Sequence, residues 1–68
     1  MPNKTINLLK VAWNKRYEEV KDNPKRLANL MNDFYIAHKS EINEFPWFKN
    51  FYEKVVNRYE EVCKSISV

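Results

Sequence analysis

The stretch FKNFYEKVVNRYEEVCKSI, residues 48–66, decides the fold of this chain. Intervals of alternately three and four residues place side chains on one face of an α-helix and form a seam of heptads. Phe51 and the preceding Trp47 widen this apolar stripe, so the segment predicts an amphipathic helix that faces two neighbours. The seam consists of Phe48, Tyr52, Val55, Tyr59, Val62 and Ile66.

Two prolines set the helix boundaries on either side of the central segment. Pro46 disfavours helical angles at the residue before it and is itself favoured in a first helical turn, so the last helix should span about residues 46–65. Pro24 acts in the same way, and Asn23 is the predicted N-cap of a helix that ends near residue 43. Its apolar face should hold Leu27, Leu30, Met31 and Phe34. A break at Ser40, which is able to cap a separate short turn, is the alternative.

The N-terminal segment repeats the helical spacing. Asn3 or Thr5 is the expected cap, and the helix should span about residues 4–21. Its predicted inner face carries Ile6, Leu9, Trp13, Tyr17 and Val20. A chain of 68 residues has room for a single core, so the predicted fold is all-α, a small three-helix bundle forming one domain over residues 1–68.

The amino-acid composition limits the classes of fold and function that we expect for the chain. The chain has ten aromatic residues and no glycine, which favours dense helical packing over hairpins or glycine-rich phosphate loops. Cys63 is its one cysteine, so an intramolecular disulfide is impossible. A mixed charge of +3, with no long apolar run and no signal pattern, leads us to expect a protein of the cytoplasm that contacts no membrane.

Catalysis and metal binding are not expected. His38 is the only histidine, and a metal site needs several converging ligands. Cys63 lies beside the core seam, where it is most simply a small apolar filler, although it and His38 belong to different helices that are able to approach. We therefore predict no enzyme activity, no catalytic residue, no metal and no cofactor.

The sequence RYEEV occurs twice, at residues 16–20 and 58–62. Tyrosine and valine three positions apart share a helix face, so the simplest interpretation is that they face the core while the glutamates face water. The alternative is that the two copies form matching surfaces for a partner. Charged residues four apart on the outer faces also predict ion pairs: Lys15 with Glu19, Lys49 with Glu53, and Glu60 with Lys64.

Nucleic-acid binding is the alternative function, in the form of a DNA-binding protein dominated by phosphate contacts, such as a transcriptional regulator. Lys21, Lys25 and Arg26 are the candidate phosphate contacts. Residues 26–31 resemble the first helix of a helix-turn-helix. The resemblance ends at Asp33, because Phe34 and the apolar residues after it stand where a polar reading surface is required.

Protein binding is the leading prediction, with an intracellular adaptor, inhibitor or regulator of another protein as the expected role. Three large rings in Glu44-Phe45-Pro46-Trp47-Phe48 surround a helix junction where not all of them turn inward. Their alternative role is to plug the end of the bundle. The predicted partner-binding residues are Phe45, Trp47, Phe48 and Tyr52. A homodimer through the third helix is a second hypothesis, based on the heptad seam.

Overall fold

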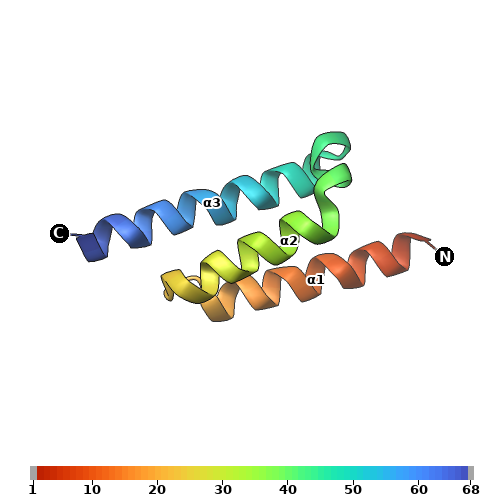
Figure 1. Ribbon diagram of the computed structural model, residues 1–68. Coiled ribbons are helices and arrows are strands. Elements are labelled where there is room, and N and C mark those ends of the chain that lie inside the picture. Colours follow the sequence, from red (N-terminus) through yellow and green to blue (C-terminus); the bar gives the residue numbers. More distant parts are fainter. Residues whose placement is uncertain (1, 68) are drawn as a thin grey trace.

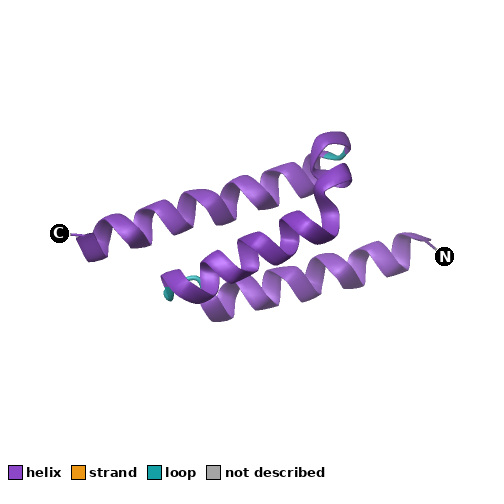
Figure 2. Ribbon diagram, viewed as in Figure 1, coloured by secondary structure: helices purple, strands orange, loops and turns teal. Residues whose placement is uncertain are grey.

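The computed structural model describes residues 2–67, with side chains for residues 6–65, and confirms an all-α three-helix bundle (Figure 1). Its helices are α1 (Pro2–Val20), α2 (Pro24–Glu44) and α3 (Pro46–Ser67). Residues 21–23 and the single residue Phe45 connect them (Figure 2). The molecule is elongated, at 47 × 22 × 16 Å, and the start of α1 lies at the same end as the α2–α3 junction (Figure 1).

Each helix opens on a proline, which suits a position where the missing backbone N–H has no helical partner. The expected caps of the first helix were wrong, because Asn3 and Thr5 lie inside α1, which already begins at Pro2. Asn23 is confirmed as the cap of α2. Its backbone is extended, and its side-chain oxygen accepts a hydrogen bond of 3.1 Å from the backbone N–H of Arg26.

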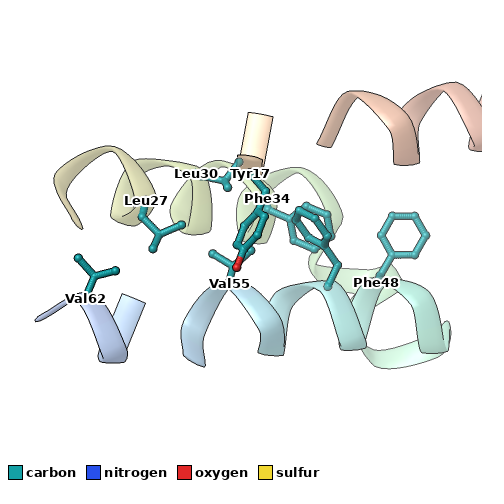
Figure 3. Packing of buried hydrophobic residues seen from close by; sticks show 8 residues of the cluster. Tyr17, Leu27, Leu30, Phe34, Phe48, Val55 and Val62 are labelled. Atoms are coloured by element: carbon teal, nitrogen blue, oxygen red, sulfur yellow. The ribbon is translucent and has the colours of Figure 1, made fainter. Parts of the chain in front are cut away.

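The core lies mainly between α2 and α3, which pack together over much more of their length than α1 and α2. Figure 3 shows Leu27 of α2 opposite Val62 of α3, and Phe34 above Val55 further along the pair. Tyr17 is the one buried side chain that α1 contributes among the described residues. Within residues 6–65, the buried hydrophobic side chains are Tyr17, Leu27, Leu30, Phe34, Phe48, Phe51, Val55 and Val62.

Phe34 is the centre of this core and is fully buried. Its ring centroid lies 5.0 Å from that of Trp13 on α1 and 4.8 Å from that of Phe51 on α3. Aromatic pairs at such separations contribute about 0.5–1.5 kcal/mol each beyond the area that they bury. Phe34 of α2 therefore packs against side chains of both other helices.

α2 changes direction at His38, where the backbone has the non-helical angles φ −132° and ψ 27°. α2 thus continues to Glu44, close to the predicted end near residue 43, and in place of the alternative break at Ser40 it has a kink two residues earlier. Helix kinks usually follow from proline or glycine, but α2 contains neither after Pro24. The kink lies where the His38 ring contacts Trp13 of α1 and Phe48 of α3. Beyond it, the end of α2 bends towards α3 and away from α1 (Figure 1).

Replacing Phe34 with alanine is expected to destabilise the protein by about 3–5 kcal/mol, because it removes a fully buried ring and leaves a cavity. Urea unfolding followed by circular dichroism measures this loss. Ile36→Ala is the matched control, since Ile36 is 69% exposed on the same helix and its loss should change stability by about 0.5 kcal/mol or less. Equal effects of the two substitutions would contradict the central role of Phe34.

Candidate functional site

The kink at His38 produces the main apolar groove of the described residues. Because α2 bends away from α1 there, the first turns of α1 have no helix directly opposite, and Ile6 remains 40% exposed although its spacing predicted a core position. The resulting open groove has a volume of about 710 Å³. Its lining consists of Ile6, Asn7, Leu9, Lys10, His38, Glu41, Phe45, Pro46, Trp47 and Phe48.

The floor of the groove is aromatic. Trp47 stacks on Phe51 at 5.2 Å and meets Phe48 edge to face at 5.1 Å, so its position is fixed from below while part of its ring faces the groove. Phe45, in the connection between α2 and α3, is 52% exposed. Another hollow of about 510 Å³, near Arg58, is lined by polar side chains with Val62 as its one apolar residue. The junction groove is therefore the better apolar site.

One wall of the groove is positively charged and the other negatively charged. The Lys10 ammonium on α1 lies 5.5 Å from the centroid of the Trp47 ring, a cation–π contact, and has no carboxylate within ion-pair distance among the described residues. On the α2 side, Glu41 places Oε1 3.8 Å from Nδ1 of His38. The apolar floor thus has a free cation on the α1 rim.

His38 joins α1 to α2 where the two helices separate. The indole Nε1 of Trp13 donates a hydrogen bond of 3.2 Å to Nε2 of His38. The imidazole ring also lies against Phe48, with 5.0 Å between centroids. Its Nδ1 is buried without a hydrogen-bond partner in the described part of the chain. Because an indole N–H only donates, Nε2 must carry the lone pair and the neutral ring must hold its proton on Nδ1.

Three of the four predicted partner-binding residues lie at this groove. Phe45 is exposed, Trp47 is partly buried and Phe48 is buried beneath them, so the junction both plugs the bundle and presents aromatic surface. Tyr52 is not part of the groove. Its ring lies 5.7 Å from that of Tyr35, between α2 and α3.

The candidate phosphate contacts lie elsewhere, around the α1–α2 turn and the start of α2. Lys21 forms an ion pair of 2.9 Å with Glu18, and that hydrogen bond raises the pKa of the lysine. Lys25 and Arg26 are exposed, and neither has an ion-pair partner among residues 6–65. A helix-turn-helix is absent here because α2 continues through Asp33 and buries Phe34.

Cys63 and His38 do not form a catalytic pair. The His38 ring contacts Phe48, and Cys63 lies fifteen residues further along α3, about 22 Å away at 1.5 Å per residue. The Cys63 side chain instead forms a hydrogen bond with Tyr59, which raises the pKa of the phenol. Among the described residues no group of three or more histidine, cysteine, aspartate or glutamate side chains is placed to hold a metal ion.

The two RYEEV segments follow the simpler interpretation. Tyr17 and Val62 are buried, their counterparts are partly buried, and all four glutamates are exposed. Each arginine pairs with an aspartate from another segment: Arg16 with Asp33 at 2.6 Å, and Arg58 with Asp22 at 2.5 Å. The ion pairs predicted along single helices, such as Lys15 with Glu19, do not form within the described residues.

The chain matches no protein-family model, no curated protein and no solved structure among those compared. Within residues 2–67, none of the helices combines the length and the apolar character that crossing a membrane requires.

Sequence reasoning missed the α1 wall of the groove and both polar residues of α2. Ile6 and Leu9 were assigned to the core by their spacing, while Lys10 was assigned to the solvated face. His38 and Glu41 join the site because of the kink, for which residues 36–42 contain no proline or glycine signal. The sequence signal that did succeed was the accumulation of rings beside Pro46.

Proposed function

We propose that this protein is a non-enzymatic protein-binding module whose junction groove receives an amphipathic segment of a partner protein. An apolar side chain of the partner would lie on the floor formed by Trp47 and Phe45, and a carboxylate of the partner would pair with Lys10. Amphipathic segments commonly bind in this way, with apolar anchors in a groove and charges at its rim.

The observation that carries the proposal is the exposure of aromatic surface beside an unpaired cation. Phe45 is 52% exposed and Trp47 is partly buried, in a domain that has few large side chains to spare for its core. Tryptophan is typical of the anchors that dominate binding energy at interfaces. The Lys10 ammonium, 5.5 Å from the Trp47 ring, adds a specific charge to the apolar floor.

The role that follows is that of an adaptor, inhibitor or regulator in the cytoplasm. A groove of about 710 Å³ accommodates a few side chains of a partner. Binding of this kind changes the availability of the partner's own surface, which is how small inhibitors and adaptors act.

We expect Phe45→Ala and Trp47→Ala to lose a partner that the unaltered protein captures from cells, because each removes apolar contact area at the centre of the groove. Typical losses at such anchors exceed about 2 kcal/mol, or roughly thirtyfold in affinity. Affinity capture with quantitative mass spectrometry identifies the partner, and titration of the purified partner gives the affinity. Lys10→Ala should weaken binding less than either aromatic substitution does. Its effect should be larger at low salt than at high salt.

Ile36→Ala is the matched control for this experiment, because Ile36 is an equally apolar, exposed side chain outside the groove. The helical circular dichroism signal of every variant must equal that of the unaltered protein. If the Phe45→Ala protein captures the same partner with the same affinity, the groove is not the binding site. Loss of the helical signal in Trp47→Ala would assign Trp47 to the core, and Phe45→Ala then decides the question alone.

DNA binding remains the second candidate, supported by the exposure of Lys25 and Arg26 without carboxylate partners in the described part of the chain. Two unpaired cations would provide too few phosphate contacts for measurable DNA binding. We therefore expect no measurable binding to mixed-sequence duplex DNA at either about 50 mM or about 200 mM salt, as measured by fluorescence anisotropy. Binding that falls steeply with salt and disappears in Lys25→Ala/Arg26→Ala would instead favour the DNA-binding alternative.

The homodimer through α3 is a further hypothesis about partners. Phe48, Val55 and Val62 of the seam are already covered within the chain, so a second copy would gain little apolar contact there. We expect sedimentation at micromolar concentration to return the mass of a single chain of 8.3 kDa. A species of twice that mass would revive the dimer and make the exposed Phe45 its first candidate contact.

A further inference from the structure

We infer that protonation of His38 regulates the junction groove by exchanging the bond to Trp13 for one to Glu41, an inference that depends on the proposed function for its biological role. The starting point is the neutral ring. Nε2 accepts the Trp13 N–H at 3.2 Å, and Nδ1 is buried with its proton unpaired. A second proton binds at Nε2, because Nδ1 already carries one.

That proton is incompatible with the bond to Trp13. An indole N–H has no lone pair available in the ring plane, so a protonated Nε2 and the indole Nε1 would present two donors to each other. The pair must separate. The imidazolium then carries a proton on Nδ1 that faces Glu41, whose Oε1 is 3.8 Å away and needs only a small shift to reach hydrogen-bond distance.

Of the charged groups that line the groove with His38, Glu41 favours this exchange and Lys10 does not. Glu41 on α2 attracts the imidazolium, and Lys10 on α1 lines the same groove with its ammonium over Trp47. The groove residues that α3 contributes are Pro46, Trp47 and Phe48, none of which is charged. A charged His38 therefore has its attractive partner on its own helix, whereas the bond that it gives up is the one to α1.

The groove is affected because this bond lies at the fork between the two helices. Arg16 ties the C-terminal half of α1 to Asp33, whereas the N-terminal half has its nearest hydrogen bond to α2 at Trp13. Loss of that bond loosens the wall that bears Ile6 and Lys10. Protonation of His38 should therefore release the partner, and loss of that proton should restore the groove.

The test follows the Trp13 indole N–H by ¹⁵N-resolved NMR between about pH 8 and 5. In the unaltered protein we expect one sigmoidal change of its chemical shift, with the same midpoint at the methyl groups of Ile6 and Leu9, while the Ile36 methyl remains constant. His38→Gln should remove the step, because glutamine places an uncharged acceptor near the position of Nε2.

A Trp13 signal that is constant over this range, or a step of the same size in His38→Gln, would overturn the inference. The signal is assigned by its absence in Trp13→Phe. The capture experiment repeated at pH 5.5 and 7.5 tests the consequence for binding: the unaltered protein should lose the partner at the lower pH, whereas equal capture at both pH values would show that the switch does not control binding. The NMR step reports the switch without any partner, so its failure is distinct from a failure of the groove to bind.

Discussion

The packing of the Phe34 ring is the constraint on which the rest of the structure depends. Trp13 approaches this ring from α1 and Phe51 from α3, so the relative positions of the three helices follow from contacts with one side chain of α2. His38, one turn further along α2, continues the same cluster, with its ring 5.2 Å from that of Phe34. The core, the link between α1 and α2, and the groove therefore form one continuous aromatic assembly.

The small size of the chain explains why aromatic residues dominate this assembly. A domain of about 60 residues buries only about 60% of the surface that its unfolded chain exposes, so each buried side chain must contribute a large area. Because the core requires most of the large side chains, few are left to cover the α2–α3 junction. Phe45 is therefore half exposed, although burial of its ring would add a large apolar area to the core.

The helices themselves were predictable because the signals that specify them are local. Spacings of three and four residues identified the inner faces of the helices. Pro24 and Pro46 are the first residues of α2 and α3, as predicted. Only the first start differs from the prediction, because Pro2 opens α1 as the other two prolines open their helices. Asn23 was identified as a cap for an equally local reason, since its own side chain reaches the third residue after it.

The features that the sequence did not reveal all depend on contacts between segments. Arg16 and Arg58 bind aspartates of other segments in place of partners along the helix, and that choice depends on how the helices lie together. At the kink, His38 likewise forms a hydrogen bond with Trp13, 25 residues away in the chain. The candidate site was therefore half predicted: its aromatic floor follows from composition, but its second wall exists only because α2 bends.

The unequal pairing of the helices has a consequence for the motions of the molecule. α2 and α3 form a closely packed hairpin, while α1 contributes Tyr17 and partly buried side chains and makes less extensive contact. Regions with fewer buried apolar contacts open at lower free energy than the rest of a fold. Detachment of α1 is thus the least costly partial unfolding, and its backbone amides should exchange with deuterium before those of the hairpin.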